Sequence, residues 1–153
     1  MSAQQVSVTR TIAATPEQLF KVVADASLHH VIDGSGTVKG TKGKAEPLHL
    51  GSKFAMRMKM GVPYVIGSTV VEYEENRRIA WAHVGKHRWR YEFEPLDDVD
   101  GEPRTQVTET FDWSTSLFPK GIELVGYPRK HVPNMERTLE RLEAFVTNRT
   151  SAL

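Results

Sequence analysis

The C-terminal end of this chain carries one long amphipathic helix pattern, and the residues before it are mostly typical of β-strands. From Val132 onwards, apolar residues recur in steps of three and four, which places them in one stripe along a helix. The stripe consists of Val132, Met135, Leu139, Leu142 and Val146. We expect the longest helix to run from Pro119 to about Thr147 and to bury this stripe against a sheet.

Alternating apolar and polar residues predict strands in most of the preceding chain. The alternation is clearest in Gln5–Ile12 and Lys53–Met60, where a half-buried strand explains it best. Further strands are expected at Ser35–Gly40, Tyr64–Tyr73, Arg78–Val84, His87–Glu94 and Arg104–Trp113, with a polar loop at Pro95–Pro103.

The connection at Gly85-Lys86 decides which aromatic side chains share a face. If it is a two-residue hairpin turn, Trp81 and His83 point to the face opposite Trp89. A longer connection or a bulge puts Trp81 and Trp89 together, because a one-residue slip moves every side chain to the other face. The sequence leaves both registers open.

Two short helices are expected after the first strand. Thr15-Pro16-Glu17-Gln18 has the residues of a capping box with proline at the first helical position. This helix should end near Ala26, and Ser27–Val31 can form a second short helical turn. The order of strand, two short helices, several strands and one long helix favours an α+β architecture. We predict a curved antiparallel sheet of about six to seven strands wrapped around the C-terminal helix, with space for a ligand between them.

Composition narrows the possible functions. The chain has 153 residues, and we expect a single domain over residues 1–153. Lys and Arg number 20 against 19 Asp and Glu, so the formal net charge is +1. A net charge this small gives no long-range field that steers a protein to nucleic acid or to an anionic membrane. The sequence has no cysteine, which excludes disulfides and thiolate metal sites.

The sequence also bears on location and cofactors. No apolar stretch approaches the roughly 18 residues of a membrane span, and Met1–Gln5 is polar, unlike a signal peptide. Gly43-Lys44 is followed by Ala45 instead of the Ser or Thr of a phosphate-binding loop. We therefore expect a cytoplasmic protein with no stable membrane insertion, no nucleic-acid partner and no cofactor.

Several motifs resemble one superfamily, the START-related and polyketide cyclase/dehydrase-like proteins (SRPBCC, helix-grip fold). The motifs are Ala14-Thr-Pro-Glu-Gln-Leu-Phe20, the stretch Asp25–Gly36, Glu94-Pro95-Leu96 and Thr105-Gln-Val-Thr-Glu-Thr-Phe-Asp112. Asp33-Gly-Ser-Gly-Thr37, Arg57-Met-Lys-Met-Gly61 and His87-Arg-Trp-Arg-Tyr-Glu92 are similar to an actinobacterial branch of it. The resemblance implies a helix-grip fold and a small hydrophobic ligand, without choosing between carriers, enzymes and partner-binding proteins.

An apolar ligand site is predicted beneath the sheet. Phe54, Met56 and Met58 share one strand face, and methionine suits a pocket that accepts varied apolar ligands. Ordinary core packing is the competing explanation. The residues predicted to bind the ligand are Phe20, Phe54, Met56, Met58, Trp81, Trp89, Phe111 and Met135.

Glu109 and His83 are the candidate catalytic residues. Glu109 alternates with Val107 and Phe111, so it should face inward, where burial raises the pKa of an unpaired carboxyl group. Cyclisation of a polyketone requires one proton taken from carbon and one delivered to oxygen, which a carboxyl and an imidazole can supply. Alternatively, Glu109 pairs with an arginine or lies near the cavity mouth, and His83 ends a strand at the surface.

A metal site is not expected. His29 and His30 are adjacent and diverge by about 100° on a helix. His30 and Asp33 can share a face, but two ligands are too few for zinc.

Three functions remain open at this level. The first is binding or transport of a small hydrophobic ligand such as a lipid, a polyketide or an aromatic metabolite. The second is a polyketide cyclase, aromatase or dehydratase, which inward acid-base residues would favour. The third is a module that binds a partner protein, which a filled core and an exposed apolar patch would favour.

Overall fold

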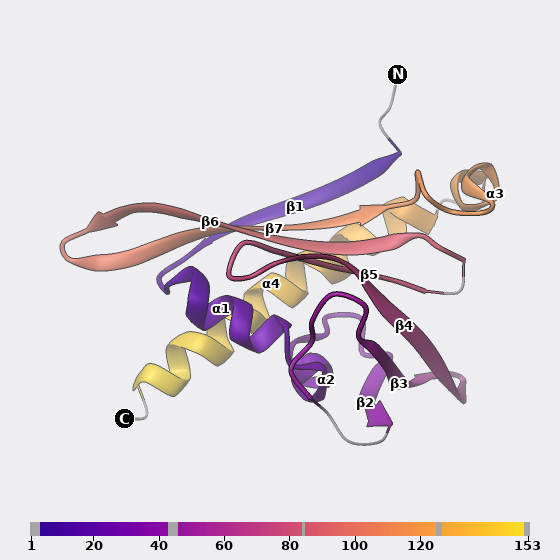
Figure 1. The fold of residues 1–153 in the computed structure, drawn as a ribbon, viewed down its shortest axis with the longest axis horizontal. Helices are drawn as coiled ribbons and strands as arrows, with labels where there is room; N and C mark the ends of the chain where they lie inside the picture. Colours follow the sequence, from indigo (N-terminus) through magenta and orange to yellow (C-terminus); the bar gives the residue numbers. More distant parts are fainter. Residues whose placement is uncertain (1–3, 43–45, 84, 125–126, 152–153) are drawn as a thin grey trace.

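A computed structural model describes residues 4–42, 46–83, 85–124 and 127–151 of the chain (Figure 1). The N-terminal half contains β1 (Gln5–Ile12), α1 (Pro16–Val23), the 3-10 helix η1 (Ala26–Leu28), α2 (His29–Ile32), β2 (Val38–Lys42), β3 (Lys53–Met60) and β4 (Val62–Glu74). The remainder contains β5 (Arg78–Ala82), β6 (Arg88–Val99), β7 (Glu102–Asp112), α3 (Pro119–Leu124) and α4 (Tyr127–Ser151).

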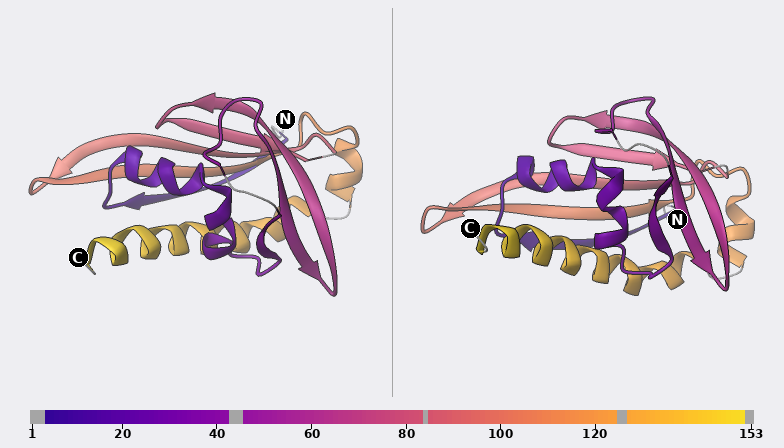
Figure 2. Two further views of the ribbon diagram at one scale, coloured as in Figure 1. Left: turned by 60° about the horizontal axis from the view of Figure 1, so that its bottom comes forward. Right: turned by 90° about the horizontal axis from the view of Figure 1, so that it is seen from below.

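The strands of the described residues form one antiparallel sheet in the order β1-β7-β6-β5-β4-β3-β2. The sheet curves, and α4 lies along its concave side with α1 and α2 beside it (Figure 2). The predicted α+β helix-grip fold is confirmed. The expected short helices are also confirmed. Thr15 and Gln18 form the reciprocal capping box, with Gln18 N donating to Thr15 Oγ1 at 3.1 Å.

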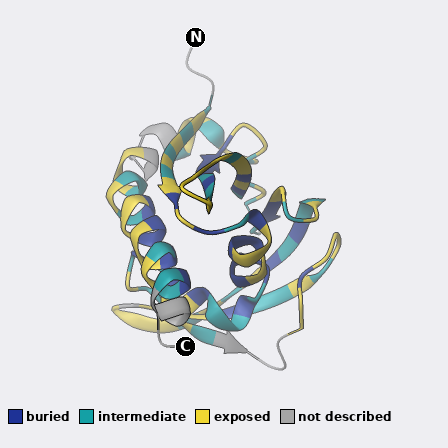
Figure 3. Cartoon of the chain, turned by 90° about the vertical axis from the view of Figure 1, so that its left-hand side faces the viewer, coloured by how far each residue is buried: buried dark blue, intermediate teal, exposed yellow. Residues whose placement is uncertain are grey.

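The apolar stripe of α4 faces the sheet, as predicted. Met135, Leu139, Leu142 and Val146 are buried, whereas Val132 is half-buried. Figure 3 shows the helix buried on the side facing the other elements and exposed on its outer side. The stripe is therefore the main contact between the helix and the rest of the fold.

The prediction of a single helix from Pro119 is wrong in its N-terminal part. Helix α3 ends at Leu124 and the long helix begins at Tyr127. Position 128 is a proline, which lacks an amide hydrogen and fits the first turn of a helix far better than its interior. The sequence therefore favours a new helix start at this point.

The prediction of a polar loop at Pro95–Pro103 is also wrong. Strand β6 continues to Val99, and β7 begins at Glu102. Asp100 and Gly101 both have positive φ, 52° and 79°, as a two-residue type I′ hairpin turn requires. The turn therefore lets a polar sequence extend the hairpin beyond the body of the sheet.

The register around Gly85-Lys86 follows the longer connection. Trp81 pairs with Trp89, and Ala82 pairs with Arg88, so the two tryptophans share the inner face. The two-residue turn is excluded. Strand β5 ends at Ala82, and Val84, the expected end of that strand, lies outside the described residues.

The Asp33-Gly34 segment fastens α2 to α4. Gly34 N donates to Thr138 Oγ1 at 2.9 Å, and Arg137 Nε donates to Gly34 O at 3.0 Å. A Cβ atom at position 34 would lie 2.6 Å from the Cβ atom of Arg137. Only glycine fits here, because the backbone itself touches the helix.

Candidate functional site

The inner face of the sheet carries two rows of side chains that cross several strands. In the first row, Glu109 of β7 lies opposite Val8 of β1 and Tyr91 of β6, and Tyr91 lies opposite Ile79 of β5. In the next row, the pairs are Val6–Phe111, Phe111–Trp89 and Trp89–Trp81. A carboxyl group is thus held among aromatic and aliphatic side chains by the register of the sheet.

Glu109 is the most deeply buried acid of the site. Its residue is 3% exposed, and its Oε1 atom has no hydrogen-bond partner among the described residues. The side chain shares a hydrogen bond with Tyr91. Burial raises the pKa of the Glu109 carboxyl well above its ordinary value, the hydrogen bond from Tyr91 opposes this, and the nearby Asp33 charge adds to it. Together these causes favour the protonated form of Glu109, which can donate as well as accept a hydrogen bond.

Tyr91 is the partner of this acid. Burial raises the pKa of its hydroxyl well above the ordinary value, and the neighbouring Glu109 raises it further. Its ring lies against Trp81, with the ring centroids 5.6 Å apart. The pair therefore presents hydrogen-bonding oxygens within an aromatic surface.

His29 of α2 adds a second buried polar group. Its ring stacks on Trp81 at 4.8 Å and meets Phe54 edge-on at 5.7 Å. Its Nε2 atom is 2.8 Å from Val23 O. A carbonyl oxygen only accepts, so Nε2 carries the hydrogen and Nδ1 is the acceptor nitrogen. Burial lowers the pKa of His29, which keeps the ring neutral.

The predicted ligand residues all lie on the inner side of the fold, but they belong to two apolar clusters. Phe20, Met56 and Trp81 are buried in the larger cluster, and Phe54, Met58 and Trp89 pack against it half-buried. Phe111 and Met135 are buried in a smaller cluster that Trp89 also touches. Trp89 therefore connects the two. Whether these residues line a ligand cavity stays a prediction.

Phe20 occupies a different environment from the other members of this set. Its ring meets Tyr73 and Phe93 edge-on, with centroids 5.6 and 5.8 Å away. Phe93 is buried as well. Phe20 is therefore tightly packed beneath α1, against Tyr73, which lies opposite Ile79 at the far end of Glu109's row.

Three histidines gather at the end of the sheet near α3. The rings of His83 and His87 are 5.2 Å apart, His87 is 5.4 Å from Phe111, and His131 is 4.7 Å from Phe111. His83 Nδ1 is 2.7 Å from Ser68 Oγ. Burial, followed by the neighbouring His87, lowers the pKa of His83 and of His131 to about 4. These imidazoles are neutral at pH 7 and half-buried.

The two candidate catalytic residues lie in different places. Glu109 is level with Ile79, through Tyr91, and His83 comes four residues later, which is about 13 Å along a strand. Each has its own polar partner, Tyr91 for Glu109 and Ser68 for His83. Their use as one acid-base pair stays a hypothesis, and it requires a substrate that reaches both.

The described part of the chain holds no group of three or more potential metal-ligating side chains. His29 is buried whereas His30 is exposed, so the two point apart. None of the helices described has the length and hydropathy needed to cross a bilayer. A hollow of about 340 Å³ lies between the β4–β5 turn and strands β6 and β7, away from the predicted ligand residues.

The sequence did not identify Tyr91, His29 or Ser68 as site residues. The face on which Tyr91 lies relative to Trp81 depends on the register that the sequence leaves open at Gly85-Lys86. His29 invited a metal hypothesis because a second histidine follows it. Ser68 alternates with Ile66 and Val70, a polar residue at an inward position, and this was the available signal.

Comparisons with known proteins agree with this fold. A family model described as "Polyketide cyclase / dehydrase and lipid transport" matches residues 3–147. The protein Rv0088 of Mycobacterium tuberculosis is 38% identical over 143 residues, which cover 90% of this chain and 62% of that protein. This chain therefore spans about 62% of the length of that relative.

Solved structures show the same fold at low sequence identity. Protein NE0264 from Nitrosomonas europaea superimposes with a TM-score of 0.71 at 14% identity, over the whole of both chains. The di-domain ARO/CYC StfQ from the steffimycin biosynthetic pathway gives a TM-score of 0.63 at 12% identity, covering 96% of this chain and 51% of StfQ.

Proposed function

This chain belongs to the polyketide cyclase/dehydrase and lipid transport family, and from that premise we propose that it binds a small, mostly apolar molecule beneath the sheet. We propose further that Glu109 and Tyr91 hold one oxygen atom of that molecule. The observation that carries the proposal is the unpartnered Oε1 atom of the buried Glu109.

A buried polar atom without a partner costs roughly 1–3 kcal/mol, so a fold retains one chiefly where a bound group satisfies it. The raised pKa of Glu109 favours its protonated form, and a protonated carboxyl group donates one hydrogen bond and accepts others. The complementary group on a ligand is a carbonyl or hydroxyl oxygen. An anionic group is disfavoured, because Asp33 already places negative charge nearby.

The surroundings favour an aromatic or otherwise flat apolar body. Trp81 lies against both Tyr91 and His29, and Trp89 lies between the two apolar clusters. Met58 adds an adaptable side chain to the same side of the sheet. Few polar groups fix such a ligand, so binding should tolerate varied apolar skeletons.

Probe binding tests the apolar part of the proposal. N-phenyl-1-naphthylamine, whose fluorescence rises in apolar surroundings, should bind with roughly micromolar affinity, about 8 kcal/mol. Met58→Trp should weaken this binding by filling space while leaving the fold intact. Val99→Trp, at an exposed position far from the site, is the matched control and should bind the probe normally.

A pair of naphthalenes tests the polar part. 2-Acetylnaphthalene carries a carbonyl oxygen that 2-ethylnaphthalene lacks. The double variant Glu109→Leu/Tyr91→Phe should bind the ketone about fivefold more weakly or worse, because about 1 kcal/mol of hydrogen bonding is lost. The hydrocarbon should change by less than twofold. Equal changes for both compounds would contradict a role for this pair in holding an oxygen.

Catalysis of the cyclase, aromatase or dehydratase kind is the second candidate. A neutral, buried carboxylic acid can deliver a proton to a ketone oxygen, and a neutral imidazole such as His29 or His83 can accept one from carbon. That StfQ is an ARO/CYC supports the possibility. In this case Glu109→Gln abolishes turnover of a polyketone while binding of N-phenyl-1-naphthylamine is retained.

Binding of a partner protein is the function that remains if the ligand hypothesis fails. If the naphthalenes and N-phenyl-1-naphthylamine do not bind, and Met58→Trp only destabilises the fold, the space beneath the sheet is solid core. The carrier and cyclase functions then both give way to a partner-binding role.

A further inference from the structure

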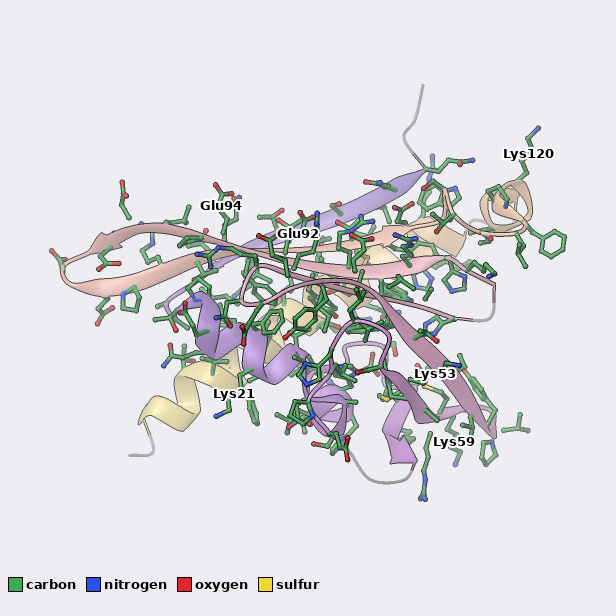
Figure 4. All side chains as sticks on the ribbon, viewed as in Figure 1. Lys21, Lys53, Lys59, Glu92, Glu94 and Lys120 are labelled. Atoms are coloured by element: carbon green, nitrogen blue, oxygen red, sulfur yellow. The ribbon has the colours of Figure 1, made fainter. Side chains whose placement is uncertain are left out.

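The fold separates the charges of a chain that is almost neutral overall. The β6–β7 hairpin projects from one end of the long axis, and α3 and the tip of the β3–β4 hairpin lie at the other (Figures 1 and 2). The acidic end carries the exposed residues Asp97, Asp98, Asp100 and Glu102, and the exposed Glu94 and Glu92 follow along β6 toward the middle of the molecule (Figure 4). The basic end carries the exposed residues Lys53, Arg57, Lys59, Lys86 and Lys120.

The β3–β4 hairpin supplies one part of the basic end. Arg57 lies beside Val65, and Lys59 lies beside Pro63, so cations and apolar side chains share its outer face. Val62 at the tip is 68% exposed. The sequence contains no Asp or Glu from position 47 to 71, so the acidic residues of the hairpin, Glu72 and Glu74, lie at the end of β4 away from its tip.

The loop before α3, residues 113–118, supplies the second part of the basic end. Phe118 is 75% exposed, and Leu117 beside it is also exposed. Leu117 N donates to Gly85 O at 3.0 Å, and Thr115 Oγ1 donates to Lys86 O at 2.7 Å, which holds the β5–β6 connection against this loop. Lys120 follows on α3. Figure 4 places Lys120, Lys53 and Lys59 at the same end of the molecule.

We propose that this basic end docks reversibly on an anionic lipid surface, with the β3–β4 hairpin and the loop before α3 as its two points of contact. Lysines beside exposed apolar side chains are the combination that binds an anionic bilayer interface. The apolar side chains stand on two projections, at Val62 and at Phe118, and a flat deformable surface can meet both. This inference goes beyond ligand binding and does not depend on it.

The separation of charge explains how an almost neutral chain can orient. Surface charges are screened beyond about 8 Å at physiological ionic strength. The 25 residues of α4 alone span about 37 Å, and the two charged ends lie at opposite ends of the molecule's long axis. A membrane near the basic end therefore meets the exposed lysines and not the carboxylates of the β6–β7 hairpin. The net charge of +1 is the wrong quantity for predicting this interaction.

Flotation with vesicles tests the proposal on the whole chain. The protein should float with vesicles of phosphatidylcholine containing about 30% phosphatidylglycerol at low salt, and should be released by about 0.5 M NaCl. Lys59→Glu and Lys120→Glu should each weaken binding about fivefold or more, and Phe118→Ser should weaken it as well. The matched controls are Lys21→Glu on α1 and Val99→Ser on the acidic hairpin, which should bind as the parent does.

Four outcomes would overturn the proposal. They are no binding to anionic vesicles, equal binding to pure phosphatidylcholine, equal losses in the control variants, and binding to soluble poly-L-glutamate without binding to vesicles. The last would assign the basic end to an acidic protein. Circular dichroism and N-phenyl-1-naphthylamine binding of Phe118→Ser should match the parent, which separates failure of this inference from failure of the proposed ligand binding.

Discussion

The space under the sheet has two parts that differ in how they are packed. Beneath α1, residues such as Leu19, Phe93 and Leu139 are almost completely buried and contribute no polar side-chain atom. In the other part, the half-buried side chains are Met58, Trp89, His83, His87 and His131. The unpartnered oxygen of Glu109 borders this region. Under the proposed function, the first part holds the fold together and the second binds the ligand. A protein with one helix over one sheet can divide the two tasks in this way.

The largest effect is expected from disrupting the solid part. Leu139→Asp places a charge in the contact between α4 and the sheet, where it has no partner and the cost is several kcal/mol. We expect a loss of about 4 kcal/mol or more in the free energy of unfolding, measured by urea denaturation. Glu136→Ala, on the exposed side of the same helix, should change it by less than 1 kcal/mol. Equal stability of Leu139→Asp and the parent would show that the stripe does not form the core.

Glu109→Leu/Tyr91→Phe should instead stabilise the folded state, by about 1–3 kcal/mol at pH 7, because it removes a buried and unsatisfied oxygen without leaving the Tyr91 hydroxyl unpaired. The pH dependence sharpens this expectation. Because the folded-state pKa of Glu109 is raised, only the unfolded chain releases the proton just above its own pKa of about 4.3. Stability of the parent therefore falls as pH rises from there toward the raised pKa, by at most about 1.4 kcal/mol per pH unit.

In Glu109→Leu/Tyr91→Phe this fall should be absent, so the stability difference between variant and parent should grow with pH above about 4.3. Urea unfolding at several pH values measures it. A difference that is independent of pH would show that Glu109 is ionised in the folded protein, and the proposed hydrogen-bond donor would be lost.

A smaller effect is expected at His83, where the change of stability with pH has the opposite sign to that caused by Glu109. The folded-state pKa of His83 is lowered to about 4, chiefly by burial, whereas the unfolded value is about 6.5. Between these values only the unfolded chain takes up the proton, so stability is lost as pH falls from 6.5 to 4. His83→Gln should reduce that acid loss by about 1–2 kcal/mol, after allowing for solvent screening of a half-buried group.

Thermal unfolding between pH 4 and 7 measures the acid loss of His83→Gln. His30→Gln, at an exposed position on α2, is the control and should follow the parent. If the loss of stability at acid pH is unchanged in His83→Gln, then His83 is open to solvent and is not a buried part of the site.

Much of the fold could be predicted from the sequence because its periodicities are strong. The alternation of Lys53–Met60 and the stripe of α4 each fix a face. The helix break before Tyr127 and the long β6–β7 hairpin were missed, although Pro128 and the Asp100-Gly101 turn carry the signals. In the hairpin, the polarity of Pro95–Pro103 favours a loop, whereas the turn residues Asp100-Gly101 favour two long strands.

The site was less predictable because it depends on contacts between distant segments. The pairing of Tyr91 with Glu109 follows from the register across β6 and β7, two strands that the Asp100-Gly101 turn joins, whereas the connection at Gly85-Lys86 decides how Tyr91 pairs with β5. The stacking of His29 on Trp81 joins α2 to β5, and no periodicity predicts it. The separation of charge is a property of the fold as well, since composition reports only the net value.

Methyl NMR of the methionines tests the central claim most directly. Protein labelled with ¹³C at the methionine methyl groups should be titrated with 2-acetylnaphthalene. If the ligand binds beneath the sheet, the methyl resonances of Met56, Met58 and Met135 should shift with one common dissociation constant, and Glu109→Leu/Tyr91→Phe should raise that constant about fivefold. Unshifted resonances for these three methionines at saturating ligand would contradict a binding site between the sheet and α4.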